Sequence, residues 1–435
     1  MNLFDISLRL SGYPIAAARQ ELQQLQKQNA KEHERYIAEK KLEIAHYHLK
    51  NNRFYGNFTG LKQLKSWEEL PILSKSDLQQ PLGNMLSQNF SKKEVYLGKT
   101  SGSSGEPFQF AKDKWCHALS WASFYAHYAK CGISLSGDLQ ARFYGIPLRG
   151  KNRIKEQFKD LLSNRYRFPI FDLDPERFEN FLLKFKNTPF AYINGYTSSI
   201  LLFSRFLKDK NVVLKYVCPS LKLCIVTSEM LFETDRELME RQLGVPVVNE
   251  YGASETGLIA FENDRKQLLI DEKLLYVEIV DAEGEILPHG EKGHLVITSL
   301  YNKSQTFVRY AIGDLGILNR DHETGNLFLQ ELSGRNNDNV QLPSGKVVPG
   351  LAFYYIIKKA IEKTGNVKEM VVAQTAINHF EITYVSDRPL NKKEEAAVTT
   401  AMVDYLEGGI NIVLKRVPAL QRSPSGKLKQ FHSQL

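Results

Sequence analysis

The sequence predicts an α/β protein with a large multi-layer N-terminal domain and a small α+β domain at the C-terminus. Three observations predict it. Strand-like apolar runs alternate with helical stretches in the middle of the chain, short strands dominate from about 274 to 332, and a new helix–strand pattern follows Gly334. A chain of 435 residues is too long to fold around one ordinary hydrophobic core. We therefore expect domains at 1–333 and 334–435.

The first two thirds of the chain predict helices and then alternating elements. Residues 15–50 carry apolar side chains at helical spacing. The alternation that follows is typical of a largely parallel sheet. The strands expected there are 139–146, 190–193, 222–227 and 246–249, and the helices are 115–130, 175–186, 197–208 and 230–243.

The remaining third predicts an antiparallel subdomain and then the small domain. Turn signals such as Glu283-Gly284 separate short apolar runs, which favours antiparallel strands. These strands are expected at 276–281, 294–300, 306–310, 315–319 and 327–331. The small domain is expected to hold helices at 351–364 and 392–407 and strands at 369–374, 379–385 and 410–416.

The bulk composition excludes several classes of protein. The net charge of +8 comes from basic residues that are spread along the chain, which favours a solvated surface with some attraction for anionic ligands over nucleic-acid binding. No apolar run reaches membrane-spanning length, and the start does not resemble a signal peptide. Four cysteines without a C-x-x-C pair argue against a disulfide framework or a compact zinc site. We expect a cytoplasmic protein.

The most informative segment is Lys99–Pro107, in which glycines stand among four hydroxyl residues. Glycine lets backbone N–H groups approach an anion closely, and hydroxyls add donors. The segment lacks the features of a Walker loop and of a dinucleotide fingerprint. It suits the outer phosphates of a nucleotide, with a plain flexible loop as the alternative.

A second polar segment, Asn249–Gly257, follows an apolar strand, where open α/β sheets bind ligands. Glu255 can hold Mg²⁺, which prefers carboxylate and phosphate oxygens, and Tyr251 can stack on a base. The alternative is an ordinary turn with exposed polar residues.

Three further segments carry candidate side chains. Asp314 follows a glycine at a predicted turn between strands, where its carboxylate can accept hydrogen bonds from both ribose hydroxyls, although a β-turn aspartate is the simpler explanation. Arg335 lies in the polar segment between the domains. Lys427 lies in a Ser-Gly-Lys tip that can project an ammonium group into a distant site, with a frayed basic tail as the alternative.

The five segments, in this order, resemble the core motifs of the adenylate-forming superfamily, which includes acyl-CoA synthetases, nonribosomal adenylation domains and luciferases. The branch of phenylacetate-CoA ligases and capsule-biosynthesis proteins is the most similar, on Arg53-Phe54-Tyr55 and on the segment 70–78. The resemblance extends over almost the whole chain from about residue 35. It implies an AMP-forming ligase that makes an acyl-adenylate from a carboxylic acid and ATP with Mg²⁺, and then transfers the acyl group to a thiol, with CoA as the expected acceptor.

The resemblance also implies roles for particular residues. Glu255 would bind Mg²⁺, Ser254 would face the α-phosphate, and Asp314 and Arg335 would contact the ribose or phosphate. Lys427 would stabilise charge while the carboxylate attacks the α-phosphorus, and the small domain would rotate before the second half-reaction. The nucleotide would also contact Thr100, Ser101, Gly102, Ser103, Ser104, Gly105, Tyr251, Gly252 and Ala253.

The acyl pocket is expected where the family lines it. Aromatic residues there suit an aryl or otherwise apolar acid, and simple core packing is the alternative. The residues concerned are Tyr192, Asn194, Gly195, Ser228 and Glu229.

Phe108 stands where the superfamily often has lysine, which weakens phosphate binding only slightly. Asn337 and Gln341 replace frequent hinge residues, and these two departures leave the acceptor open. A separate acyl carrier protein, an amine or a hydroxyl, for example in polysaccharide assembly, is the alternative acceptor. A non-catalytic nucleotide-binding scaffold is a further alternative, against which the presence of Lys427 and Glu255 argues.

Overall fold

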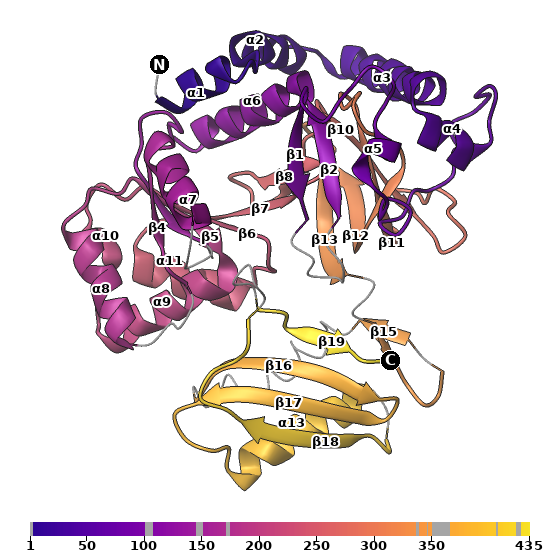
Figure 1. Ribbon diagram of the computed structural model, residues 1–435. Helices are drawn as coiled ribbons and strands as arrows, with labels where there is room; N and C mark the ends of the chain where they lie inside the picture. The colour runs from indigo at the N-terminus through magenta and orange to yellow at the C-terminus, as the bar shows by residue number, and fades with distance from the viewer. Residues whose placement is uncertain are drawn as a thin grey trace. The chain divides into compact units, whose positions relative to one another are not determined.

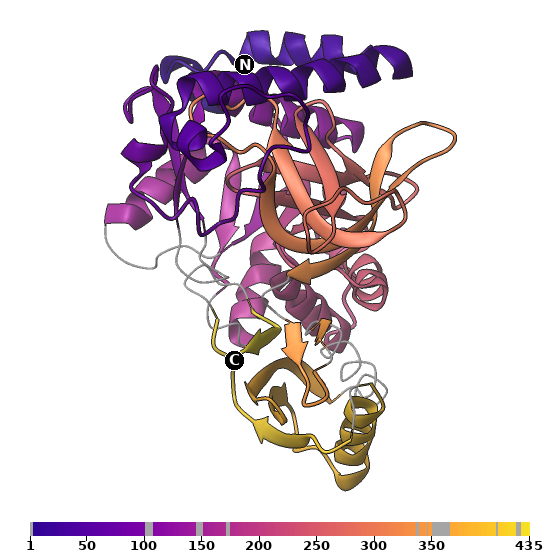
Figure 2. The same cartoon turned by 90° about the vertical axis from the view of Figure 1, so that its right-hand side faces the viewer.

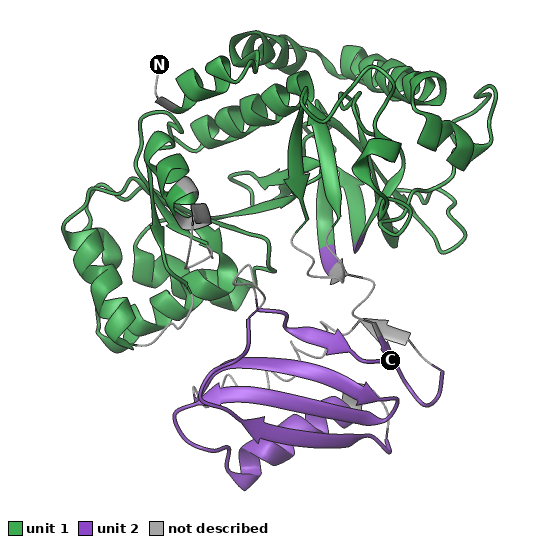
Figure 3. Cartoon of the chain, viewed as in Figure 1, with its two compact units in different colours: residues 1–312, 316–331 green, residues 313–315, 332–435 purple. Residues whose placement is uncertain are grey.

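A computed structural model of the chain divides into two compact units (Figures 1 and 3). Unit 1 comprises residues 1–312 and 316–331, and unit 2 comprises 313–315 and 332–435. The structure describes residues 3–100, 108–144, 151–170, 175–335, 339–345, 347–349, 366–405, 408–422 and 428–435.

The parallel half of an 11-stranded sheet confirms the predicted alternation in unit 1. Its strands, from the edge inward, are β4 (Arg165–Phe168), β3 (Gln140–Phe143), β5 (Tyr192–Tyr196), β6 (Leu223–Thr227) and β7 (Val247–Ala253). The helices that precede or connect them are α6 (Lys114–Lys130), α7 (Lys151–Leu162), α8 (Pro175–Lys186), α9 (Thr197–Asp209), α10 (Leu214–Val217) and α11 (Glu233–Leu243).

The other half of the sheet continues from β7 with antiparallel pairs. Figure 2 shows how strongly these strands, coloured salmon to orange, twist and curl. In sheet order they are β8 (Gly257–Glu262), β9 (Leu268–Ile270), β13 (Leu327–Arg335), β12 (Tyr310–Arg320), β11 (Lys292–Ser299) and β10 (Leu275–Val280).

One predicted strand in this half is wrong. Residues 306–309 belong to no strand, and a single strand instead runs from Tyr310 to Arg320. Arg309 adopts a φ of 46°, in the left-handed region, which interrupts an extended chain just before Tyr310.

The N-terminal helices also differ from the prediction, because residues 15–50 form two helices. Asn29 begins the second helix with a capping box: its side chain accepts a hydrogen bond from the Glu32 backbone N–H, and the Glu32 carboxylate accepts one from the Asn29 N–H. The elements of this part are α1 (Leu3–Leu10), α2 (Ile15–Gln26), α3 (Ala30–Asn51), α4 (Arg53–Thr59), α5 (Leu82–Met85), β1 (Val95–Lys99) and β2 (Gln109–Asp113).

The two faces of the parallel strands differ in character. One face packs into a core rich in phenylalanine, in which the rings of Phe143, Phe168 and Phe185 stack. A smaller apolar cluster, which includes Tyr128 of α6 and Tyr192 of β5, packs on the other face. Burial of these side chains stabilises the sheet from which the site loops extend.

Unit 2 contains a four-stranded sheet in the order β18-β17-β16-β19, with β19 as a short strand that the sequence did not predict. The expected helix at 351–364 lies outside the described residues. The described elements are β14 (Asn339–Gln341), β15 (Val347–Pro349), β16 (Val367–Ala376), β17 (His379–Ser386), α13 (Lys392–Tyr405), β18 (Asn411–Arg416) and β19 (Phe431–Ser433). In the described part of the chain, no helix combines the length and apolarity needed to cross a bilayer.

Candidate active site

The polar segment after β7 forms a tight hairpin with β8. Residues 254–256 make the turn, and the strand register shifts between Tyr251 and Gly252. A Cβ atom at Gly252 would lie 2.7 Å from the carbonyl oxygen of Gly257, so this position requires glycine. The hairpin is therefore a specific backbone structure at the carboxyl end of a parallel strand, where open α/β sheets bind ligands.

Glu255 is the buried carboxylate of this hairpin. The hydroxyl of Tyr310, at the start of β12, donates a hydrogen bond to its Oε1 at 3.1 Å. Glu255 is 8% exposed, whereas its neighbour Ser254 is exposed. Tyr310 thus orients the side chain to which the sequence assigns Mg²⁺, and sequence reasoning did not assign Tyr310 a role.

Lys112 is a buried cation near Glu255 that the sequence analysis missed. It lies on β2, is 4% exposed, and forms no hydrogen bond or ion pair with any residue in the described ranges. Burial lowers the pKa of its ammonium group, while the charge of Glu255 acts to raise it. A lysine directly after the apolar residues Phe110 and Ala111 was the available signal.

Asp314 is buried, but the predicted turn is wrong. The residue lies inside the continuous strand β12, directly after Gly313, whose φ is +88°. The positive φ of Gly313 makes a local irregularity in the strand, and the chain does not reverse direction at the Gly-Asp pair.

Arg309, in the same motif, has a structural role. Its guanidinium forms a buried ion pair with Glu278 at 2.6 Å and donates a hydrogen bond to the Leu70 carbonyl at 2.7 Å. This arginine therefore ties the segment before β12 to β10 and to the early part of the chain.

The expected acyl-pocket residues divide between two settings. Tyr192, Asn194 and Gly195 are buried on β5, and a Cβ at Gly195 would lie 2.4 Å from that of Phe143, so this glycine allows close strand packing. The Glu229 carboxylate accepts a hydrogen bond from the Ser198 backbone N–H at 2.7 Å, in the first turn of α9. This contact stabilises the N-terminus of α9, and the place of Glu229 in an acyl pocket stays a prediction. Ser228, next to it, has a φ of 69°.

The remaining predicted site residues are described only in part. Thr100 pairs with Phe108, because its N–H donates to the Phe108 carbonyl and its Oγ1 accepts from the Phe108 N–H, each at 3.1 Å. Arg335 is the last residue of β13, and its side chain lies outside the described part of the structure. Residues 101–105, Asn337 and Lys427 also lie outside the described residues.

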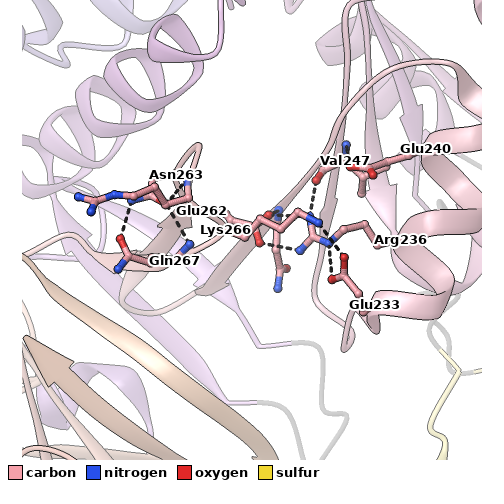
Figure 4. A network of polar contacts seen from close by, with 10 residues as sticks. Glu233, Arg236, Glu240, Val247, Glu262, Asn263, Lys266 and Gln267 are labelled. Carbon is pink, nitrogen blue, oxygen red and sulfur yellow. Dashed lines mark hydrogen bonds and ion pairs between the residues drawn. The ribbon is translucent and has the colours of Figure 1, made fainter. Parts of the chain in front are cut away.

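A network of buried charge holds β7 in place from the side of α11 (Figure 4). Arg236 of α11 forms a two-pronged ion pair with Glu262 of β8, with distances of 2.6 and 3.0 Å, and donates to the Val247 carbonyl. Glu262 also accepts from the Asn249 N–H at 2.8 Å. The strand that leads into the Glu255 hairpin is thus fixed at its beginning by charge-assisted hydrogen bonds.

The described residues contain no group of three or more His, Cys, Asp or Glu side chains arranged to hold a metal ion. Glu255 nevertheless fits Mg²⁺, since this ion is held in nucleotide sites by one or two carboxylates together with phosphates and water. A metal site of that kind is completed by the nucleotide.

The chain is similar to several known proteins in sequence or in fold. No family model matches the chain. Protein CapK of Staphylococcus aureus is 23% identical over 314 residues, which cover 69% of this chain and 67% of that protein. A phenylacetate-coenzyme A ligase of Aromatoleum evansii is 32% identical over 124 residues, which cover 27% of this chain and 28% of the ligase. A crystal structure of 2-hydroxyisobutyryl-CoA ligase in the postadenylation state superposes with a TM-score of 0.72 at 17% identity, over 93% of this chain and 90% of that one.

The chain is similar in sequence to Protein CapK and, over part of its length, to phenylacetate-CoA ligases, and it shares the fold of 2-hydroxyisobutyryl-CoA ligase. This confirms the resemblance and the fold class predicted from the motifs. The match to the phenylacetate-CoA ligase spans less than a third of that enzyme, so activity and substrate are taken up as proposals below. An ATP-bound structure of MatB from Rhodopseudomonas palustris also shares the fold of this chain, with a TM-score of 0.51 at 15% identity.

Proposed function

We propose that the protein is an AMP-forming ligase that activates a carboxylic acid as an acyl-adenylate and transfers the acyl group to a thiol, with CoA as the acceptor. The observation that carries the proposal is the β7–β8 hairpin, which places the buried, Tyr310-bonded Glu255 at the carboxyl end of the parallel strands. The phenylacetate-CoA ligase relatives and the fold support it.

The chain's own residues would divide the first half-reaction between them. Thr100 and the loop that follows would hold the outer phosphates, Tyr251 the base, and Asp314 the ribose. Lys427 would neutralise charge as the acid's oxygen attacks the α-phosphorus. In-line displacement releases pyrophosphate, so no covalent bond to the protein is needed.

Mg²⁺ would be held by Glu255 and the nucleotide phosphates, and when bound it offsets phosphate charge. The hydrogen bond from Tyr310 fixes one carboxylate oxygen, Oε1. Oε2 is the oxygen that would face the metal ion.

The two units suggest how the halves of the reaction are separated. Residues 1–333 would bind ATP and the acid, and 334–435 would act as a mobile lid that carries Lys427. The exposed turn Pro343–Gly345 would approach the thiol in the second half-reaction.

The acceptor has a second candidate. The backbone of Gln341 is held by the Gln374 side chain, which donates to its carbonyl at 2.7 Å and accepts from its N–H at 3.4 Å. Gln341 departs from the residue frequent at the family's hinge, so transfer of the acyl group to a separate carrier protein, an amine or a hydroxyl is the alternative.

Pyrophosphate exchange tests the proposal directly. Labelled pyrophosphate should enter ATP only when a suitable acid is present, across a panel of aryl, fatty, hydroxy, dicarboxylic and amino acids. Thioester formation after CoA is added supports the first acceptor, and exchange without thioester supports the second. A protein that binds no adenine nucleotide would contradict the proposed function.

A further inference from the structure

The face of the parallel sheet opposite the phenylalanine core carries polar side chains beside the smaller apolar cluster that includes Tyr128 and Tyr192. Side chains alternate between the faces of a strand, and Ala141 and Phe143 of β3 belong to the apolar core. Gln140 and Arg142 therefore lie on the other face. The strand register places Arg142 next to Asn194 of β5, which is one of the expected acyl-pocket residues.

Most polar groups on this face have partners within unit 1. Gln140 Nε2 donates to Asn194 Oδ1 at 3.4 Å, and Asn194 Nδ2 donates to the Ile225 carbonyl at 3.3 Å. The Tyr128 hydroxyl donates to Glu250 Oε2 at 2.9 Å. These bonds satisfy the amides and the carboxylate without a ligand.

Arg142 is the exception. Its Nε is buried without an acceptor, and among the described residues its guanidinium forms no hydrogen bond or ion pair. The guanidinium carbon instead lies 4.1 Å from the ring centre of Tyr144. A buried donor loses its hydrogen bonds to water, and without an acceptor this loss is not compensated. The arrangement therefore favours a ligand that supplies the acceptor.

The chemistry of that ligand follows from the guanidinium. Its planar fork of N–H donors matches a carboxylate in two parallel hydrogen bonds, and its charge favours an anion over a neutral acceptor. Stacking on Tyr144 holds the group in one orientation, and Arg142 is only partly buried, so a ligand has access to it.

We propose that Arg142 binds a second anionic group on the acid that this protein activates, so that the substrate is a dicarboxylic acid. The inference rests on the proposed function and differs from the aryl or apolar acid expected from the sequence. One carboxylate reacts with ATP, and the other remains ionised against Arg142. Arg142 is a specificity-determining residue in this scheme and takes no part in bond making.

The surroundings of Arg142 are compatible with a bound anion. Glu250 is the nearby carboxylate, and burial raises its pKa, against which hydrogen bonds from Tyr128 and Thr227 and the charge of Arg142 act. The direction of this shift reduces the negative charge that would oppose a second carboxylate on the same face.

Matched acids test the proposal on the full chain. Dicarboxylates from malonate to adipate, and phthalate, are compared with their monoamides in pyrophosphate exchange and in calorimetric binding. The wild type should prefer at least one diacid over its monoamide by about 100-fold in kcat/KM, because the amide leaves the guanidinium without its ionic partner. R142Q should lose this preference while its KM for ATP and its melting temperature stay unchanged.

Two further variants separate specificity from structure. R142K keeps the charge without the fork and should recover part of the diacid preference. K222Q removes the same charge from a half-exposed lysine just before β6 and should behave as the wild type.

The outcomes distinguish the two proposals. A neutral acid used as well as its diacid, or an R142Q variant with unchanged diacid preference, overturns the role of Arg142 and leaves the ligase activity standing. Diacid binding that depends on Arg142 but supports no pyrophosphate exchange confirms the binding site and contradicts the ligase activity.

Discussion

At the scale of single residues, the buried polar groups of unit 1 separate structural from functional roles. Glu255 and Glu278 each have a defined partner, Tyr310 and Arg309 respectively. Lys112 and Arg142 form no hydrogen bond or ion pair within the described ranges, although Arg142 stacks on Tyr144 and each lies near a buried carboxylate, Glu255 and Glu250 respectively. Since a buried charge without hydrogen bonds is costly, a bound anion would stabilise either cation.

Asp314→Ala tests the assigned ribose contact. Loss of the carboxylate removes two charge-assisted hydrogen bonds to the ribose and should raise the Kd for ATP by about tenfold or more. Calorimetry with ATP measures it. Asp264→Ala, in an exposed turn, is the matched control, and an unchanged Kd in D314A would refute the assignment.

His48 predicts a pH dependence of stability. It is fully buried on α3 beside the Asn302 carbonyl, 2.8 Å from Nε2, and burial lowers its pKa to about 4. Between pH 6.5 and 4 the unfolded chain binds a proton that the folded chain does not. The free energy of unfolding therefore falls as the pH drops through this window, by up to about 3 kcal/mol from this group.

The measurement is urea unfolding at pH 7 and pH 4.5 for the wild type and for His48→Gln. The variant should lose less stability on acidification. His46→Gln, on an exposed face of the same helix, should keep the wild-type pH dependence, and equal slopes in H48Q and wild type would count against the assignment.

At the scale of elements, the β7–β8 hairpin is the unit on which the site is built. Its turn contains Glu255, its close approach requires Gly252, and its beginning is fixed to α11 by Arg236 and Glu262. The predicted strand ended at residue 249, whereas β7 continues to Ala253. Pairing with β8 extends the strand through the polar motif, and a single-sequence pattern does not contain that pairing.

Glu262→Gln should destabilise unit 1, because it leaves the Arg236 guanidinium without its buried counter-charge. We expect a loss of about 3 kcal/mol in the free energy of unfolding. Glu233→Gln is the matched control, since Glu233 pairs with the same arginine but is 58% exposed, and should cost less than about 1 kcal/mol. Urea unfolding compares the two, and equal losses would argue against a dominant role for the buried pair.

At the scale of the whole molecule, the proposed reaction requires residues from both units. Unit 1 contains the Glu255 hairpin and the face with Arg142, and the tip with Lys427 belongs to the sequence of unit 2. The domain boundary after residue 333 stays a prediction. The two compact units divide between residues 331 and 332, and unit 2 also includes residues 313–315.

Lys427→Ala tests the division of labour between half-reactions. The variant should lose acyl-adenylate formation by about 100-fold or more, because charge on the α-phosphate is no longer offset. Thioester formation from a chemically prepared acyl-adenylate should persist. Lys429→Ala serves as the control two residues away, and adenylation by K427A at the wild-type rate would remove Lys427 from the mechanism.

The sequence by itself determined the order of elements and of motifs. The helix and strand alternation from α6 to β7 and the five motifs are local patterns of residue type and spacing, so a single chain contains them. The misjudged places, at Asn29, Arg309 and Gly313, are those where one backbone conformation or cap overrides a longer apolar pattern.

Only the tertiary structure decided which side chains meet. Tyr310 bonds Glu255 across 55 residues of sequence, Glu229 meets the start of α9, and Arg142 is left without an acceptor between strands that are distant in the chain. These facts depend on strand register and on burial, which arise when separate elements pack together. The resemblance to the family could therefore be recognised from the motifs, whereas the dicarboxylic acid proposed for Arg142 required the folded sheet.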